Sequence, residues 1–374
     1  MRVQEAVTRD GLTRYLLVTD EGDIVEPVAR YLKYLDATGK ARNTIRAYCH
    51  HLKLYFEFLS QAHLDWRRVG LDDLASFVRW LRSPFGSTKV IPATPVREAR
   101  AVRTVNMVLS AVVDFYEYLA RSGHYCTQLP EQLKRAVSTS RRRFKGFLYH
   151  VARNKPTQRN ILRLREPNSL PRALSADEVQ KLLQACSNSR DRLLVALLYH
   201  AQLRIGEALA LRLEDFDVAA GKVHVLDRGE LPNRAEIKTF SCPRTVDVAR
   251  ELINLFLDYA AEYHTHDVST GLAFIKIAGP RRGLPMTYTD VNALFKRLRR
   301  KTGIRVTPHV LRHTALTELF RAGMRPEVIQ RRAGHAHAQT TIQVYVHPSE
   351  DDIRRDWERA EARRKQESER RWHQ

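Results

Sequence analysis

The chain has 374 residues, which is enough for two domains of ordinary size, each with its own core. Its 63 lysines and arginines stand against 42 acidic residues, and the resulting net charge of +21 predicts a polyanionic partner, with duplex DNA or RNA first. Four scattered cysteines argue against a disulfide scaffold. We expect neither a signal peptide nor a membrane span, since the first residues contain no apolar stretch and no apolar run approaches roughly 20 residues. A basic surface without any specific partner is the alternative.

The N-terminal segment 1–25 predicts a small β-hairpin. Two strand-like runs flank Asp10-Gly11, a dipeptide that favours tight hairpin turns, and a polar turn follows at Asp20-Glu21-Gly22. About 25 residues are too few for an independent domain. We therefore expect an appendage to the region that follows.

Region 26–133 predicts a small all-α bundle. Apolar residues recur at helical spacing in segments 28–35, 45–59, 74–81 and 100–122. Solvated helix faces carry basic residues routinely, so each of them alone is weak evidence for a ligand. Given the net charge, we expect the basic residues of this bundle to contact DNA, the candidates being Arg42, Arg46, Arg100 and Arg103.

Region 134–170 predicts a basic linker between two domains. From Lys134 to Arg165 it contains eleven lysines and arginines and neither Asp nor Glu, with aromatic residues interleaved. A disordered spacer is one interpretation. The other is a linker that crosses the sugar-phosphate backbone, because each neutralised phosphate adds affinity. We favour the linker on DNA, with contacts from Arg141, Arg142, Arg143 and Lys145.

Region 171–350 predicts a second domain of helices with a small antiparallel sheet. Ser175 and Glu178 have the spacing of a capping box ahead of an apolar helix, and 191–199 is apolar enough to be a buried helix. Segments 222–226 and 235–248 alternate with period two and predict strands. Further helices are expected at 252–261 and 291–300, and the charged tail 351–374 predicts a helix with Ile353 and Trp357 as its apolar stripe.

The stretch from Thr307 to Pro348 holds most of the candidate chemistry. Thr307-Pro308 predicts a helix start, and three-residue spacing places His309 and Arg312 on one side of that helix. A second helix is expected from Pro326 to Gly334, with His335 directly after it and Tyr345 ten residues further on. An arginine, two histidines and a tyrosine near helix ends are suited to chemistry on a phosphate.

Two arginines are candidates for holding such a phosphate. The planar guanidinium forks of Arg204 and Arg312 would each meet two phosphate oxygens and stay charged at any relevant pH. Taken alone, Arg204 could equally be the ion-pair partner of Glu207, and Arg312 could be an ordinary surface arginine. The interpretation therefore depends on the whole set of residues.

Tyr345 is the candidate nucleophile, although any one of the chain's 14 tyrosines is structural by default. His309 and His335 could bond a phosphate oxygen or move protons, and Lys238 could protonate a leaving oxygen. A zinc site at His309 with His313, or at His335 with His337, is the competing interpretation. It is disfavoured because a fixed Arg312 between the ligands would repel the ion.

The candidate catalytic residues, in their order along the chain, resemble the catalytic set of the tyrosine recombinase (phage integrase) family. They are Arg204, Lys238, His309, Arg312, His335 and Tyr345. The matching motifs are LRIGEALALRLEDFD, IKTFSCPRTVDV, TPHVLRHT and AGHAHAQTTIQVYVH. The N-terminal hairpin and the stretch YLKYLDATGKARNTIRAYCHHLKLYFEFL are similar to the transposase-A branch carried by mobile elements. The resemblance implies an all-α core-binding bundle and an α+β catalytic domain, so the whole chain would be mainly α with a small antiparallel β-sheet.

The same resemblance implies a site-specific recombinase that cleaves and rejoins DNA strands for integration, excision or transposition. Tyr345 would form a 3′-phosphotyrosine without metal or nucleotide cofactor. Arg204 and Arg312 would clamp the phosphate. His309 and His335 would support it, and Lys238 would be the general acid. The expected partners are double-stranded DNA with recombination sites and accessory proteins. The chain would form a tetramer on DNA, with the C-terminal tail docking in trans. The expected location is the cytoplasm, in association with the nucleoid. The alternatives are a relaxase like the type IB topoisomerases and a non-catalytic DNA-binding regulator.

Overall fold

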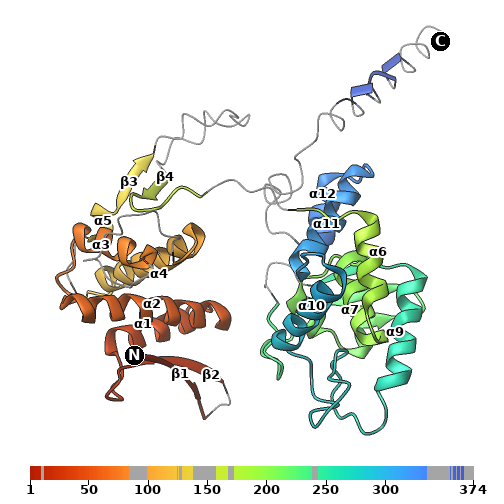
Figure 1. Ribbon diagram of the computed structural model, residues 1–374, viewed down its shortest axis with the longest axis horizontal. Helices are drawn as coiled ribbons and strands as arrows, with labels where there is room; N and C mark the ends of the chain where they lie inside the picture. The colour runs from red at the N-terminus through yellow and green to blue at the C-terminus, as the bar shows by residue number, and fades with distance from the viewer. Residues whose placement is uncertain are drawn as a thin grey trace. The chain divides into compact units, whose positions relative to one another are not determined.

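The computed structural model describes residues 1–9, 12–83, 99–123, 125, 129–137, 157–166, 172–237 and 243–334, together with 354, 357–358, 360–362 and 364–365 in the tail. The chain forms two compact units, Met1–Asn168 and Ser169–Gln374 (Figure 1). Both are mainly helical with small antiparallel sheets, which confirms the expected fold class. None of the helices described is both long enough and apolar enough to span a bilayer.

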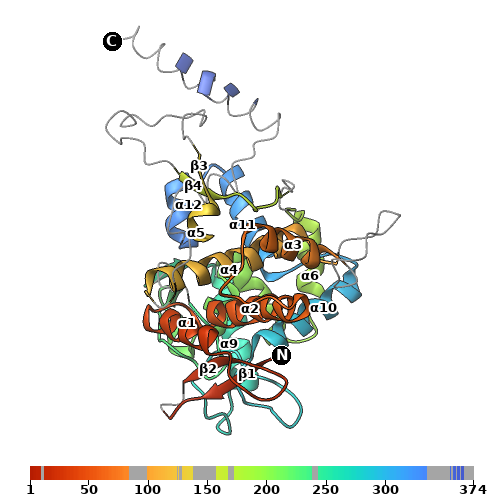
Figure 2. The same cartoon turned by 90° about the vertical axis from the view of Figure 1, so that its left-hand side faces the viewer.

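The first unit begins with the hairpin that the sequence predicts. Strands β1 (Arg2–Val7) and β2 (Thr13–Val18) pair antiparallel, with Arg2 opposite Val18. The hairpin lies along helix α2 (Figures 1 and 2). Strand β2 is the more buried of the two because Tyr15 and Leu17 point into the core of the unit.

The helical bundle of this unit also follows the predicted pattern. Its helices are α1 (Glu26–Ala37), α2 (Arg42–Ala62), α3 (Leu71–Arg82), α4 (Val102–Arg121) and the short α5 (Leu129–Gln132). Helices α2 and α4 pack against each other, and the buried hydroxyls of Tyr55 and Tyr116 lie 2.6 Å apart. The core is aliphatic and aromatic, and its largest fully buried side chains include Tyr31, Phe77 and Phe115.

Part of the expected linker is folded onto this bundle. Strand β3 (Lys134–Val137) pairs antiparallel with β4 (Thr157–Asn160), a pairing that the sequence analysis did not predict. Beyond β4, the side chain of Asn106 on α4 donates to the backbone oxygen of Leu164 at 3.0 Å and accepts from its N–H at 2.9 Å. This amide, only 6% exposed, fixes the segment after β4 to the bundle. The run Arg141–Arg143 and Lys145 lie outside the described residues.

The second unit is built around helix α7 (Ser189–His200), which is buried along most of its length. It packs against α6 (Ala176–Ala185), α8 (Ile205–Ala210), α9 (Arg250–Tyr263) and α11 (Pro308–Arg321). The remaining elements are η2 (Leu213–Asp215), β5 (Phe216–Asp217), β6 (Lys222–Val225), β7 (Arg244–Asp247), α10 (Tyr288–Thr302) and α12 (Pro326–Ala333). Strands β5, β6 and β7 form one antiparallel sheet in that order.

Local sequence signals place the helix ends of this unit where they were expected. The hydroxyl of Ser175 accepts from the N–H of Glu178 at 3.2 Å, and that of Thr307 accepts from the N–H of Val310 at 3.3 Å. Helix α12 ends at Gly334, whose φ of 62° is a conformation that glycine adopts without strain. In the C-terminal tail, residues 354, 357–358, 360–362 and 364–365 are helical, and Trp357 is 64% exposed.

The expected strand at 235–248 is wrong over its first residues. Among the residues of this range that the structure describes, 235–237 and 243–248, the strand is Arg244–Asp247, and residues 235–237 are irregular. The N–H of Ala235 donates to the side-chain oxygen of Asn233 at 3.1 Å, and the N–H of Glu236 donates to the hydroxyl of Tyr288 at 3.4 Å. Because side chains satisfy these backbone groups, the segment does not need a β-ladder despite its alternating pattern.

Candidate active site

The centre of the site is Glu207, a carboxylate that is only 1% exposed. It lies on the first turn of α8, where its Oε2 accepts from the backbone N–H of Arg204 at 2.8 Å. The guanidinium of Arg204 turns back onto the same carboxylate and donates from Nη1 to Oε1, also at 2.8 Å. The pairing of Arg204 with Glu207 that the spacing allowed is therefore present.

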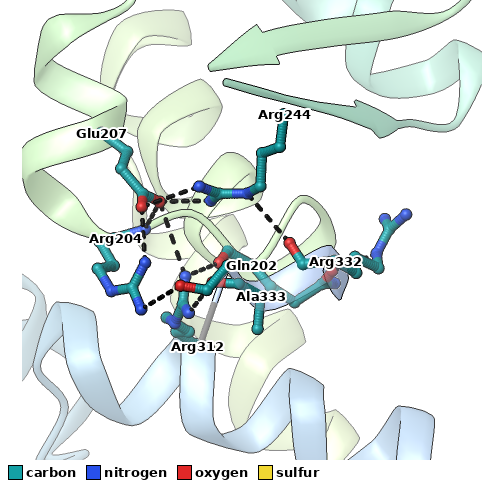
Figure 3. A network of polar contacts seen from close by, with 8 residues as sticks. Gln202, Arg204, Glu207, Arg244, Arg312, Arg332 and Ala333 are labelled. Atoms are coloured by element: carbon teal, nitrogen blue, oxygen red, sulfur yellow. Dashed lines mark hydrogen bonds and ion pairs between the residues drawn. The ribbon is translucent and has the colours of Figure 1, made fainter. Parts of the chain in front are cut away.

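Two further arginines reach this carboxylate from distant parts of the chain (Figure 3). Arg244, on β7, donates from Nη1 to Oε1 at 3.0 Å and from Nη2 to Oε2 at 2.5 Å. Arg312, on α11, places Nη1 at 3.7 Å from Oε2 and donates from the same nitrogen to the backbone oxygen of Gln202. Glu207 thus gathers guanidinium groups from α8, β7 and α11.

The carbonyl end of α12 closes the other side of the cluster. Three consecutive backbone oxygens accept from the three arginines: Arg332 O from Arg244 Nε at 3.2 Å, Ala333 O from Arg312 Nη2 at 2.5 Å, and Gly334 O from Arg204 Nη2 at 2.9 Å. The last carbonyls of a helix have no partner within the helix and carry partial negative charge. The guanidinium groups supply these partners, and the same contacts hold the C-terminal end of α12 against the cluster.

The electrostatics of the cluster favour ionised Glu207. Burial raises the pKa of its carboxyl, but the hydrogen bonds and charge of Arg244, with the charges of Arg312 and Arg204, outweigh burial and hold the pKa at about 2. The cluster of these three guanidinium groups and one carboxylate keeps an excess of positive charge. Arg204 is the most accessible of the three, its side chain 26% exposed against 8% for Arg244 and 3% for Arg312.

Gly206 lets the segment before Lys238 lie directly against α8. A Cβ added at Gly206 would stand 2.2 Å from the backbone oxygen of Glu236 and 2.7 Å from the hydroxyl of Tyr288. These distances leave no room for any side chain at this position. The glycine of the LRIGEALAL motif therefore has a packing reason, which places Glu236 beside the turn that starts at Arg204.

The structure brings together two of the six predicted catalytic residues, Arg204 and Arg312. His309 is exposed on the first turn of α11, one turn before Arg312. Lys238, His335 and Tyr345 lie outside the described residues, although His335 directly follows Gly334 in the cluster. Their roles stay predictions.

The candidate DNA contacts of the first unit differ in their surroundings. Arg46 and Arg103 are exposed on α2 and α4, and Arg42, at the start of α2, is half-buried. Arg100 donates to the backbone oxygen of Leu81 at 3.1 Å and lies over the ring of Trp80 at 5.7 Å. Arg100 therefore has a structural role at the end of α3.

A metal centre was the competing interpretation for the histidines. Within the described ranges, no group of three or more His, Cys, Asp or Glu residues is placed to hold an ion. His313 is 4% exposed and lies 3.4 Å from the hydroxyl of Thr317, within the packing of α11.

Sequence reasoning missed the central role of Glu207 and the participation of Arg244 and Arg332. The sequence spacing indicates Glu207 only as a local partner of Arg204, and the alternating pattern places Arg244 only within a predicted strand. Arg332 donates to the side-chain oxygen of Gln202 at 2.5 Å and to the backbone oxygen of Asp247 at 2.9 Å. The spacing of Arg204 and Glu207 was the one local signal, since the other contacts join residues that are far apart in sequence.

Comparison with known proteins assigns the family. Residues 172–352 match the phage integrase family, and residues 28–123 match its N-terminal SAM-like domain. Transposase A from transposon Tn554 of Staphylococcus aureus is 39% identical over 343 residues, 92% of this chain and 93% of the relative. Tyrosine recombinase XerA of Pyrococcus horikoshii is 25% identical over 338 residues, 90% of this chain and 93% of that one.

Solved structures share the fold. The Tn1549 transposon integrase in complex with transposon right end DNA superposes with a TM-score of 0.62 at 19% identity, covering 89% of this chain and 99% of that one. The XerH site-specific recombinase bound to a palindromic difH substrate gives 0.56 at 19% identity, over 85% and 82% of the two chains. With family models matched in both units and a close relative along most of its length, the chain belongs to the phage integrase family, the tyrosine recombinases that cleave and rejoin DNA.

Proposed function

We propose that the arginine cluster around Glu207 is the phosphate-binding half of a recombinase active site, in which Tyr345 attacks a DNA phosphate. The reaction moves a mobile element by integration, excision or transposition, as the 39% identity to a transposase favours. Arg204 and Arg312 hold the non-bridging oxygens of the scissile phosphate. Their charge stabilises the additional negative charge of the transition state.

The chemistry needs neither metal nor nucleotide. The phenolic oxygen of Tyr345 forms a bond to phosphorus while the bond to the 5′ oxygen breaks, which leaves a 3′-phosphotyrosine and a free 5′ hydroxyl. His309 and His335 bond the phosphate and move protons, and Lys238 gives the departing oxygen its proton. The phosphotyrosine keeps the energy of the phosphodiester for the rejoining step.

One observation carries this proposal: two arginines more than a hundred residues apart meet on the same buried carboxylate. An ordinary surface arginine has neither a buried carboxylate such as Glu207, which is 1% exposed, as its partner nor the carbonyl end of a helix as an acceptor. The same helix end leads directly into His335, and the cluster lies inside the matched integrase domain. A preformed and rigid pair of guanidinium forks suits transition-state stabilisation better than nonspecific attraction.

We further propose the arrangement in which this site works. The helical region 26–133 and the basic region 134–170 bind double-stranded DNA beside the recombination site, and the catalytic region 171–350 cuts it. Four copies assemble on two sites, with the tail 351–374 docking on a neighbouring copy and accessory proteins selecting the sites. The net charge of +21 and the DNA complexes of proteins with the same fold support the DNA partner.

The test is covalent capture of DNA. The chain is incubated with nicked suicide substrates that carry the ends of its own element, in buffer with a chelator and without nucleotide, and covalent complexes are counted on a denaturing gel. Wild type is expected to form them and Tyr345→Phe to form none while it binds the same DNA, since only the hydroxyl is lost. Tyr34→Phe, at a tyrosine 46% exposed in the first unit, is the matched control and should cleave normally. Covalent complexes from Tyr345→Phe would contradict the assignment of the nucleophile.

A further inference from the structure

We propose that Arg244 is a positioning residue of this active site: by neutralising Glu207 it leaves the positive charge of Arg204 and Arg312 to act on the DNA phosphate. The inference rests on the proposed function and assigns a role to a residue outside the predicted catalytic set. Its basis is the geometry of the three guanidinium groups around one carboxylate.

Arg244 makes the most complete contact with Glu207. Both of its Nη nitrogens donate to the carboxylate, at 3.0 and 2.5 Å, one to each oxygen. This bidentate pairing is the strongest that a guanidinium and a carboxylate form. Because the side chain of Arg244 is only 8% exposed and Glu207 only 1%, this pair is buried, whereas Arg204 is the accessible member of the cluster.

A reciprocal contact fixes Arg244 in place. Its Nε donates to the backbone oxygen of Arg332 at the end of α12, and Arg332 donates from Nη2 to the backbone oxygen of Asp247 at the end of β7. Each element therefore receives a guanidinium from the other, across 88 and 85 residues of sequence. Strand β7 and helix α12 are tied together beside the carbonyls that hold Arg204 and Arg312.

Arg204, Arg244 and Arg312 compete for the single carboxylate of Glu207. Oε2 of Glu207 already lies 3.7 Å from Nη1 of Arg312, and Oε1 lies 2.8 Å from Nη1 of Arg204. Without Arg244, the buried negative charge would be balanced by these two arginines alone, which would draw them toward Glu207 and reduce the positive charge offered to a phosphate. With Arg244 in place, the carboxylate supports the other two without neutralising them.

The experiment compares four full-length variants on the suicide substrate: Arg244→Met, Arg244→Lys, Glu207→Gln and the double variant Arg244→Met/Glu207→Gln. Two quantities are measured separately for each variant: the rate of covalent complex formation at saturating DNA, and the affinity for DNA. We expect Arg244→Met to slow cleavage about 100-fold, on the scale of losing a transition-state donor, with Kd within about 2-fold of wild type. Arg244→Lys, which keeps the charge without the fork, should lose about 10-fold.

The double variant tests whether Arg244 acts through Glu207. Removing the carboxylate removes what Arg244 neutralises, so Arg244→Met should cost less than about 5-fold in the Glu207→Gln background. Equal losses in both backgrounds, an unchanged cleavage rate in Arg244→Met, or a loss of DNA affinity with normal cleavage would each overturn the proposal.

A matched control separates positioning from folding. Arg190 is a buried arginine of the same unit, which pairs with Asp191 at 2.6 Å and donates to the backbone oxygen of Ile275 at 3.1 Å. Arg190→Met should lower the Tm while the folded molecules cleave at the wild-type rate. Arg244→Lys keeps the test decisive if Arg244→Met folds poorly. Wild-type protein that forms no covalent complex would instead refute the proposed function, independently of Arg244.

Discussion

The two units of the chain bury different kinds of side chain. Among the described residues of the first unit, the buried polar side chains are Thr13 and Asn106, and the core is otherwise aliphatic and aromatic. The second unit also buries side chains of charged residue types, namely Arg190, Asp191, Glu207, Asp215 and Arg312. Buried charge is costly unless it is paired. For Glu207 and Arg312, the pairing lies where the proposed chemistry needs fixed guanidinium groups.

The first unit shows what a scaffold without such a demand looks like. Its buried hydroxyls, Tyr55 and Tyr116, bond each other and stay neutral, because burial raises the pKa of both phenols. Aromatic packing of this kind stabilises a rigid bundle on which exposed basic residues are mounted. Variants that remove one contact at a time can test the contrast between the units.

The largest effect is expected from Glu207→Ala. It leaves Arg204, Arg244 and Arg312 close together without their common carboxylate, and breaking a buried charge pair costs about 3–5 kcal/mol. Urea unfolding, monitored by amide hydrogen exchange in each unit, should show a loss of stability in α8 and none in α4. Glu26→Ala, at an exposed glutamate paired with Arg30, is the control and should change stability by less than about 1 kcal/mol. Equal losses from both variants would erase the contrast.

Acid should destabilise the second unit before the first. The pKa of Glu207 is depressed to about 2 from an ordinary value of 4.5, so its contribution is fully present above pH 4.5 and is lost as pH falls toward 2. At about 1.4 kcal/mol per unit of pKa shift, the effect is on the order of 3 kcal/mol. Amides of α8 should lose protection in this window while those of α4 keep theirs. Earlier loss in α4 would contradict the assignment.

A smaller loss is expected from Gly206→Ala. The new Cβ would meet the backbone oxygen of Glu236 at 2.2 Å, so α8 or the segment before Lys238 must move. Overpacking of this kind costs about 1–3 kcal/mol, and the displaced segment should lower cleavage as well. Gly271→Ala is the control, since a Cβ there meets nothing within 4 Å. Thermal unfolding and the suicide-substrate assay measure both effects.

The smallest of these effects is expected in the first unit, from Asn106→Ala. It leaves the backbone N–H and carbonyl of Leu164 without their side-chain partner, at a cost of about 1–2 kcal/mol. The rate of hydrogen exchange at residues 161–166 should rise. The rate at which the variant cleaves short DNA substrates should stay unchanged, because the cleaving residues lie in the second unit. Met107→Ala, on the exposed side of α4, should be nearly neutral. Unchanged protection at 161–166 would show that Asn106 does not hold this segment.

The sequence by itself determined the features that depend on neighbouring residues. Apolar spacing predicted most helices of both units, though not the short α5, and the local signals at Ser175, Thr307 and Gly334 predicted where three of them begin or end. The resemblance to the family's motifs identified Arg204 and Arg312 as a pair, because each motif is a short run of neighbouring residues. These signals act over a few residues, so they can be read without knowledge of the fold.

Only the tertiary structure decided the contacts that join distant segments. The pairing of β3 with β4, the irregular path of residues 235–237 and the meeting of Arg244 with Glu207 all depend on partners from other elements. Alternation at 235–248 predicted a strand, but side chains of Asn233 and Tyr288 satisfied the backbone first. The strength of a buried charge pair depends on burial and geometry, and both arise only when the chain has folded.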